Sequence, residues 1–316
     1  MNLSAFFLVG PTAVGKSRIA QYIAEKHNYA ILSADSMLVY KGMDIGTAKP
    51  SREEMSRVIY GGINLVEAGE NFSVADYRCH ALAFLREMKK RNVPVIIVGG
   101  SGLYIKSLTH GLDNAAKANP EERQKWLEIL EKNGIEALQK EIISKYQDAG
   151  EIKDFLNPRR LIRYLEKKNS QLLNTKSWEE IKQQAPMAGV DMKVNNFREA
   201  VRKRVNWMYE NGLLEECKNL LISDKFFSGT SLQAIGYAEA IAFLKNEISR
   251  EGAIEKTVKR TIQLGKKQRT WFRWQAMVEW VEVSPEMTTE EIAERVVAIW
   301  NKYGPLPIYE NKENKQ

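Results

Sequence analysis

Short apolar runs that each stop at a turn mark the beginning of the chain. Residues 5–9 (AFFLV) form the first run, and after the next turn apolar side chains recur at helical spacing, as at Ile19 and Ile23. Residues 29–33 form a second run, which ends shortly before Asp35. This order predicts a strand, a helix and a second, parallel strand. Because parallel strands end at the same edge of a sheet, Asp35 is expected at the same edge as the first turn.

A further helix and strand repeat this order. The segment from about residue 73 to residue 91 has helical periodicity, and the β-branched run at 93–98 (VPVIIV) is typical of a parallel strand buried on both faces. Glycines at positions 99, 100 and 102 supply a second tight turn. Strands that alternate with helices and end at glycines predict an α/β fold. Its parallel sheet is flanked by helices, and its ligand lies beyond the carboxyl ends of the strands.

Beyond about residue 112 the strand signals stop, and a charged, helix-periodic pattern continues almost to the C-terminus. We therefore expect helices that return to the sheet and a separate helical insertion. The expected boundaries are a catalytic α/β core of residues 1–112 and 195–310, an all-helical insertion of residues 113–194 that contacts the partner, and a disordered tail of residues 311–316.

The composition is that of a folded protein with a surplus of positive charge. Of the 316 residues, 44% are hydrophobic and 28% are charged, close to ordinary globular proteins and far from disordered chains. Lysine and arginine total 47 against 40 acidic residues, which gives a net charge of +7. This surplus suits a polyanionic partner, although many cytosolic proteins share it.

Membrane, secreted and zinc-binding classes are not indicated. The longest apolar stretches fall well short of the roughly 20 residues that a membrane-spanning helix needs. The N-terminal MNLSAFFLVG runs straight into a glycine motif, which favours a buried strand over a signal peptide. Cys79 and Cys217 are the only cysteines, which excludes a disulfide framework and a multi-cysteine zinc site. We expect a cytoplasmic protein without membrane contact.

The first turn carries the most specific motif in the sequence. GPTAVGKS fits G-x-x-x-x-G-K-[ST] completely and lies between a predicted strand and a predicted helix, the context that a phosphate-binding P-loop requires. Backbone N–H groups, the Lys16 charge and the helix N-terminus favour phosphate, and the Ser17 hydroxyl can ligate Mg²⁺. The predicted phosphate-binding residues are Gly10, Pro11, Thr12, Ala13, Val14, Gly15, Lys16 and Ser17. The expected fold is P-loop NTPase-like, although the motif does not identify ATP as the ligand.

The acid that P-loop hydrolases use to hold magnesium is missing from its usual place. That acid follows a buried strand, whereas VPVIIV is followed by Gly-Gly-Ser. Asp35 is the acid best placed near the P-loop. It can cap its own loop, but its position favours a role as general base or hydrogen-bond acceptor toward a nucleophile.

Several motifs, in their order along the chain, resemble those of the tRNA dimethylallyltransferase family. They are GPTAVGKS, SADSMLVYKGMDIGTAKP, FSVADY, VGGSGLYI and NPRRLIRYLE, and the match extends from about residue 5 to residue 273. That family transfers a prenyl group from dimethylallyl diphosphate to N6 of the adenosine that follows the anticodon, in tRNAs that read codons beginning with U. The resemblance implies a monomeric transferase with Mg²⁺ as cofactor. It also implies dimethylallyl diphosphate and the tRNA anticodon stem-loop as partners.

The resemblance assigns roles to single residues. Residues Thr12 to Ser17 bind the prenyl diphosphate, where Lys16, Ser17 and Mg²⁺ would stabilise the charge that grows as the allylic C–O bond breaks. Asp35 would accept the adenine N6 proton, and Arg204 matches an arginine directed at the diphosphate. The predicted catalytic residues are therefore Asp35, Lys16, Ser17 and Arg204, with Ser17 as the metal ligand.

The same resemblance gives the residues expected to contact tRNA. They are Asp35, Ser36, Met37, Leu38, Ser101, Arg123, Arg159, Arg160 and Arg163. Arg160, Arg163 and Lys167 recur at helical spacing on one face, opposite Leu161 and Leu165. Guanidinium groups suit RNA phosphates, although spacing alone equally allows a solvated charged face.

A second basic segment, KKQRTWFR, lies at residues 266–273. Its aromatic residues, Trp271 and Phe272, are expected in the core rather than as base-stacking platforms. Gly236 and Tyr237 match a family turn, to which we assign a structural role.

The chain departs from the family pattern at a few positions. Leu38 stands where the family usually has Gln, and a leucine cannot hydrogen-bond a base edge. Ile262 and Leu264 replace an Arg and a Tyr near the second basic segment. These departures bear on substrate choice or RNA affinity rather than on the fold.

Other functions stay open at this point. A prenyltransferase of free adenine nucleotides would use the same core and chemistry, but it would not need the long basic insertion. A small-molecule kinase would use ATP at the P-loop. An inactive RNA-binding relative would explain Leu38 and Ile262, although the intact P-loop and Asp35 argue against it.

Overall fold

The computed structural model describes residues 2–112, 120–146, 148, 152, 154–169, 183–222 and 230–310. The chain forms two compact units, one built from residues 1–111 and 182–316 and the other from residues 112–181. The expected tail at 311–316 lies outside the described residues. In the part of the chain that is described, no helix is both long enough and apolar enough to cross a membrane.

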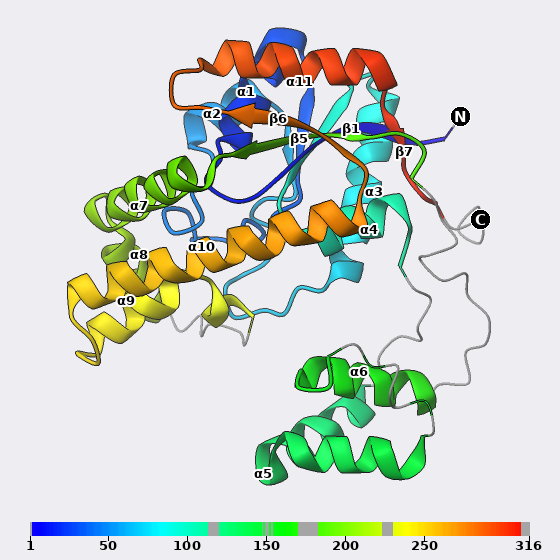
Figure 1. The fold of residues 1–316 in the computed structure, drawn as a ribbon, viewed down its shortest axis with the longest axis vertical. Coiled ribbons are helices and arrows are strands. Elements are labelled where there is room, and N and C mark those ends of the chain that lie inside the picture. The colour runs from blue at the N-terminus through cyan, green and yellow to red at the C-terminus, as the bar shows by residue number, and fades with distance from the viewer. Residues whose placement is uncertain are drawn as a thin grey trace. The chain divides into compact units, whose positions relative to one another are not determined.

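A mostly parallel sheet forms the centre of the first unit (Figure 1). Its strands follow the order β3-β2-β4-β1-β5-β6, and β7 pairs with β1 in antiparallel orientation. The strands are β1 (Ser4–Val9), β2 (Ala30–Ser33), β3 (Tyr60–Gly61), β4 (Val95–Gly99), β5 (Met187–Met192), β6 (Val278–Val283) and β7 (Leu306–Pro307). The P-loop strand β1 therefore lies between β4 and β5.

Helices cover both faces of this sheet. The helices of the first unit are α1 (Lys16–His27), α2 (Arg52–Arg57), α3 (Val74–Lys90), α4 (Gly102–Thr109), α7 (Val194–Glu210), α8 (Leu213–Ile222), α9 (Tyr237–Leu244), α10 (Arg250–Gln275) and α11 (Thr289–Tyr303), with a short 3₁₀ turn at Ser231–Gln233. Alternate residues of β1 face opposite layers, as the pleat of a strand requires. Leu8 packs in the cluster that contains residues of α1 and α11, whereas Phe7 and Val9 pack in the cluster with α3 and α4.

The expected α/β fold is confirmed, but four strands were not predicted from the sequence. One of them is β3, which has only two residues and therefore no recognisable pattern. Strands β5, β6 and β7 all follow residue 112, where only helices were expected. Strand β5 also falls inside the range 113–194 that we assigned to the helical insertion, so its residues belong with the sheet. The reason lies in their patterns: MAGVDM has a single β-branched residue, and VEWVEV places glutamates in an edge strand.

The described part of the second unit contains two helices, α5 (Pro120–Lys145) and α6 (Pro158–Asn169). Helix α5 is interrupted at Gly134, whose φ of 76° lies in the left-handed region. The two helices share an apolar core of Trp126, Leu138, Ile142, Leu161, Ile162 and Leu165. Leu161 and Leu165 are fully buried, so the packing face predicted for α6 is confirmed.

Candidate active site

The P-loop follows β1 and has glycines at two positions where the backbone has a positive φ. Gly10 has a φ of 141°, and a Cβ at this position would lie 2.2 Å from the carbonyl oxygen of Val190 in β5. Gly15 has a φ of 89° and directly precedes α1, which begins at Lys16. The predicted strand, turn and helix are therefore present, and the N-terminus of α1 faces the turn. This arrangement concentrates positive potential at the loop.

Lys16 is a buried cation at the start of α1. Its side chain is 8% exposed, and Nζ donates a hydrogen bond to the carbonyl oxygen of Pro11. Burial lowers the pKa of Lys16 to about 8, an effect that the Asp35 charge opposes and the Arg204 charge increases. A buried ammonium that lacks a full counter-charge is well suited to bind an anion.

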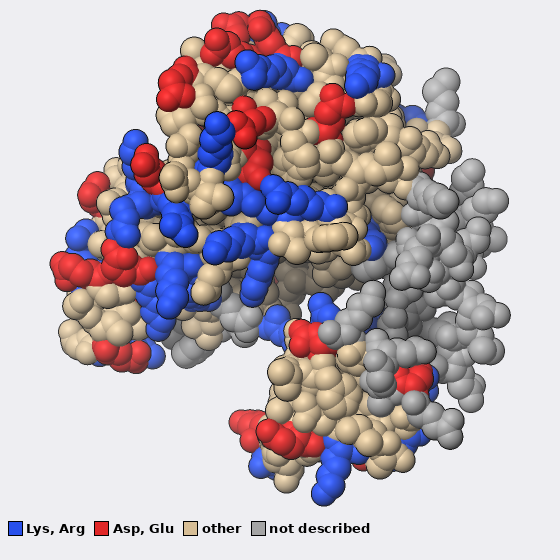
Figure 2. All heavy atoms as spheres, viewed as in Figure 1, with Lys and Arg blue, Asp and Glu red and all other residues tan. Residues whose placement is uncertain are grey.

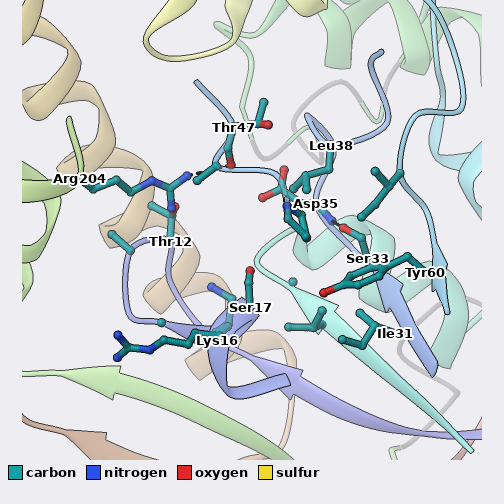
Figure 3. Close-up of a pocket in the computed structure, with 18 residues that line it drawn as sticks. Thr12, Lys16, Ser17, Ile31, Ser33, Asp35, Leu38, Thr47, Tyr60 and Arg204 are labelled. Atoms are coloured by element: carbon teal, nitrogen blue, oxygen red, sulfur yellow. Dashed lines mark hydrogen bonds between the residues drawn. The ribbon is translucent and has the colours of Figure 1, made fainter. Parts of the chain in front are cut away.

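A cavity of about 290 Å³ opens beside the P-loop (Figure 3). Its lining combines the P-loop and the first turn of α1, β2 and the loop after it, residues at β3 and β4, and one residue of α7. The lining residues are Thr12, Ala13, Gly15, Lys16, Ser17, Arg18, Ile31, Ser33, Asp35, Leu38, Thr47, Ala48, Pro50, Tyr60, Ile63, Val98, Gly99 and Arg204. All four residues predicted to be catalytic, Asp35, Lys16, Ser17 and Arg204, therefore line one cavity.

Asp35 stands where β2 ends. Its Oδ1 accepts the N–H of Met37 at 2.9 Å, and its own N–H donates to Ser33 Oγ at 3.3 Å. The loop-capping role that the sequence allowed is thus present. The same residue lines the cavity, and Figure 3 shows its carboxylate between the P-loop and Leu38. Asp35 can therefore cap its turn and face a ligand at once.

Arg204 reaches the cavity from α7. One guanidinium nitrogen donates to Thr12 Oγ1 at 3.2 Å, and the other terminal nitrogen donates to the Thr47 carbonyl oxygen at 3.0 Å. Burial lowers the pKa of Arg204, and the Asp35 charge partly offsets this. The guanidinium is thereby held against the P-loop with its orientation fixed by two acceptors (Figure 3).

Sequence reasoning missed two residues that build this site. Gln268 of α10 accepts the Thr12 N–H on Oε1 at 2.8 Å and donates from Nε2 to the Gly100 carbonyl oxygen at 3.1 Å. It therefore ties the P-loop to the turn after β4. Thr47 contributes the carbonyl that orients Arg204. Gln268 and Thr12 are 256 residues apart, and no local pattern in the sequence signals such a contact.

The end of β4 carries no acid, as the sequence indicates, but the strand β5 that was not predicted places an acid near the P-loop. Asp191 lies in β5, next to β1, and contributes to the electrostatic environment of Lys16. Its two oxygens accept from Arg269 Nε at 2.8 and 2.9 Å, so the carboxylate is already paired with a guanidinium. The missed strand explains the missed acid. Its pairing shows that it is not free in the way a magnesium-holding acid of a P-loop hydrolase would be.

The residues predicted to contact tRNA lie in both units. In the first unit, Ser36, Met37 and Leu38 follow Asp35, and Leu38 lines the cavity with an exposed fraction of 8%. Ser101 precedes α4, and its N–H donates to the Ala34 carbonyl oxygen at 3.1 Å. Ser101 is not among the residues that line the cavity.

In the second unit, the predicted basic residues divide into exposed and paired ones. Arg159 and Arg160 are exposed. Arg123 and Arg163 both approach the buried carboxylate of Glu166, at 3.6 and 3.0 Å respectively. The side chain of Lys167 lies outside the described residues. Two ion pairs with Glu166 therefore hold two of the four predicted arginines inside the unit.

The second basic segment lies on α10 and lines a groove in the first unit. Phe272 is fully buried, so its expected place in the core is confirmed. Trp271 is partly buried and packs against the same core, where a Cβ at Gly102 would lie 2.2 Å from its ring. Figure 2 shows lysine and arginine side chains gathered on this face of the first unit. The groove measures about 610 Å³, and its cationic lining residues are Lys193, Arg198, Lys266, Arg269 and Arg273. Ile262, one of the departures from the family pattern, lines the same groove.

Comparisons with known proteins match most of the chain. A family model described as IPP transferase matches residues 38–275. A tRNA dimethylallyltransferase of Caldanaerobacter subterraneus is 36% identical over 310 residues, which cover 94% of this chain and 97% of that protein. The crystal structure of a tRNA isopentenylpyrophosphate transferase from Bacillus halodurans covers 95% of this chain and 97% of its own, with 31% identity and a TM-score of 0.67. A eukaryotic dimethylallyltransferase structure, 23% identical, shares the fold with a TM-score of 0.75 over 94% of this chain and 78% of its own.

Proposed function

Because the chain belongs to the IPP transferase family, we propose that it transfers a dimethylallyl group from dimethylallyl diphosphate to N6 of the adenosine that follows the tRNA anticodon, with release of diphosphate. The observation that carries the proposal is the shared cavity, in which Lys16, Arg204 and Asp35 line one space beside the P-loop. Two cations suit the leaving diphosphate, and one carboxylate suits a proton that the acceptor loses.

The P-loop in this proposal holds a leaving group rather than a phosphoryl group that is transferred. As the allylic C–O bond breaks, negative charge grows on the diphosphate. Lys16, Arg204 and the amides at the N-terminus of α1 would stabilise that charge, because they are already oriented before the reaction. The lowered pKa of Lys16 fits this role, since a bound dianion would supply the counter-charge that the buried amine lacks.

Magnesium fits the residues that are present. No cluster of three acidic, histidine or cysteine side chains that could cage a metal occurs among the described residues. Mg²⁺ usually keeps several waters and binds through few protein oxygens together with substrate phosphates, and Ser17 supplies a hydroxyl in the cavity wall. When bound there, the ion would neutralise part of the charge on the leaving diphosphate.

Asp35 is the proposed proton acceptor for the adenine N6 amine. Its carboxylate lines the cavity at the end of β2, opposite the P-loop turn (Figure 3). Leu38, from the same loop, would contact the target base through its apolar surface, where the family usually offers an amide. The base would then be selected by shape and by neighbouring contacts rather than by a hydrogen bond at this position.

The proposed partner is the anticodon stem-loop of tRNAs that read codons beginning with U. The exposed guanidinium groups of Arg159 and Arg160 suit its phosphates, and Arg123, Arg163, Ser101, Ser36 and Met37 stay proposed contacts from the family resemblance. We propose that the enzyme acts as a monomer in the cytoplasm, where this substrate is used.

An assay with competing donors and acceptors separates the proposal from its rivals. The protein is incubated with Mg²⁺, labelled dimethylallyl diphosphate or ATP, and either unmodified tRNA or adenosine monophosphate. The proposal predicts label from dimethylallyl diphosphate in tRNA only. Label in adenosine monophosphate would favour a free-nucleotide prenyltransferase, consumption of ATP would favour a kinase, and tRNA binding without transfer would favour an inactive relative.

A further inference from the structure

The carboxylate of Glu216, which does not line the cavity, holds a loop that forms part of the cavity wall. Glu216 lies in the first turn of α8 and is half-buried. Its Oε2 accepts the backbone N–H groups of Asp44 and Ile45 at 2.9 and 2.8 Å, and its Oε1 accepts that of Gly46 at 3.3 Å. Consecutive peptide N–H groups that converge on one carboxylate form an anion nest, and hydrogen bonds to a charged acceptor are stronger than those between neutral groups.

Tyr237 fixes the position of this carboxylate from the opposite side. Its hydroxyl donates to Glu216 Oε1 at 2.5 Å, and its side chain is fully buried at the start of α9. Burial raises the pKa of Tyr237, and the Glu216 charge raises it further, so the hydroxyl keeps its proton and remains a donor. A Cβ at Gly46 would lie 2.4 Å from Tyr237 Cε2, so the glycine lets the loop lie directly on the ring.

The anchored loop ends at the residue that orients Arg204. Thr47 directly follows the three anchored N–H groups, its hydroxyl donates to the Met43 carbonyl oxygen at 2.7 Å, and its own carbonyl accepts from Arg204 at 3.0 Å. The same guanidinium contacts Thr12 of the P-loop at 3.2 Å. A continuous series of contacts therefore joins Glu216 to the P-loop.

We propose that Glu216 is a positioning residue for prenyl transfer: by holding the peptide N–H groups of residues 44–46, it places the Thr47 carbonyl that aims Arg204 at the diphosphate. The inference rests on the proposed function, because the diphosphate is the anion that Arg204 would meet. A displacement of about 1 Å in a group that acts on the transition state can cost on the order of 10²-fold in rate. Glu216 would thus affect the rate without contact with the substrate.

Glu216→Gln tests this with little change in volume. The amide NH₂ faces peptide N–H groups, so part of the nest loses its acceptor. We expect kcat for tRNA prenylation to fall by about tenfold with an unchanged KM for tRNA, because only the orientation of Arg204 is affected. The matched control is Glu215→Gln, its exposed neighbour on α8, which pairs with Lys218 at 3.7 Å. The control should retain wild-type kcat.

A double-mutant cycle with Arg204→Ala distinguishes positioning from general destabilisation. If Glu216 acts through Arg204, the combined variant should be no slower than Arg204→Ala alone, because the group that Glu216 orients is already absent. Multiplied losses would overturn the inference. So would a wild-type kcat in Glu216→Gln. If that variant does not fold, Tyr237→Phe, which removes the hydroxyl donor and keeps the ring, enters the same cycle with the same criterion.

The activity of the wild-type protein distinguishes a failure of the proposed function from a failure of the role assigned to Glu216. Failure of the wild-type protein to prenylate tRNA would refute the proposed function and, with it, this inference. Normal wild-type transfer together with an unaffected Glu216→Gln would refute the inference alone.

Discussion

Replacement of Lys16 by methionine should make the unliganded protein more stable while it slows transfer. Lys16 is 8% exposed, and burial lowers its pKa from 10.5 to about 8. At about 1.4 kcal/mol per pKa unit, this shift corresponds to roughly 3 kcal/mol by which the charged lysine lowers the free energy of unfolding at neutral pH. Methionine has a similar length and carries no charge, so most of this cost should disappear.

The gain in stability should depend on pH. Between about pH 8 and pH 10.5, the unfolded chain binds a proton that the folded protein has already released from Lys16. The unfolding free energy of the wild-type protein therefore rises with pH in this window, whereas the Lys16→Met variant lacks this contribution. The difference between the two proteins is fully present below about pH 8 and shrinks as the pH approaches 10.5.

Urea unfolding at pH 7 and pH 10 measures this difference. Lys26→Met, which removes an exposed lysine at the other end of α1, is the control and should leave the free energy of unfolding nearly unchanged, because solvent screens its charge. Magnesium diphosphate should stabilise the wild-type protein more than the Lys16→Met variant, because the lysine then has its counter-charge. A variant less stable than wild type at pH 7, by an amount that does not change with pH, would refute the reasoning.

The remaining predictions concern the proton acceptor and the basic residues of the insertion. Asp35→Asn should retain diphosphate binding in a calorimetric titration and lose turnover, and weaker binding with unchanged kcat would instead assign Asp35 to the magnesium. Arg159→Ala and Arg160→Ala should each weaken tRNA binding and reduce the salt slope by about 0.7 to 0.9, and an unchanged slope would place the RNA elsewhere. Arg163→Ala should also lower the melting temperature, because it leaves the buried Glu166 carboxylate with fewer partners; a melting temperature equal to that of wild type would contradict this ion pair.

Local patterns were enough to predict the half of the site that is contiguous in sequence. The apolar run, the glycines and the helical spacing after them predicted β1, the P-loop and α1, because backbone conformation and short-range packing determine that unit. The position of Asp35 followed from the βαβ crossover, which brings the ends of parallel strands to one edge. The P-loop and Asp35 both line the cavity.

The contacts between distant segments could not be predicted in this way. Gln268 meets Thr12 across 256 residues, and Glu216 meets Ile45 across 171, and neither helix signals its partner in its own sequence. Strand β5 was not predicted because residues 187–192 carry almost no β-branched side chains. The burial of this strand depends on neighbouring strands and helices. Arg204 was found only through resemblance to a family, since its periodicity is that of any charged helix.

Nucleoside analysis of tRNA after the reaction tests the central claim most directly. Unmodified tRNA is incubated with the protein, Mg²⁺ and labelled dimethylallyl diphosphate, and the tRNA is then digested. Mass spectrometry identifies the labelled fragment and the labelled nucleoside within it. The account predicts one dimethylallyl group on N6 of the adenosine that follows the anticodon, and its near absence with Asp35→Asn. Label on another nucleoside, or equal labelling by the Asp35→Asn variant, would contradict it.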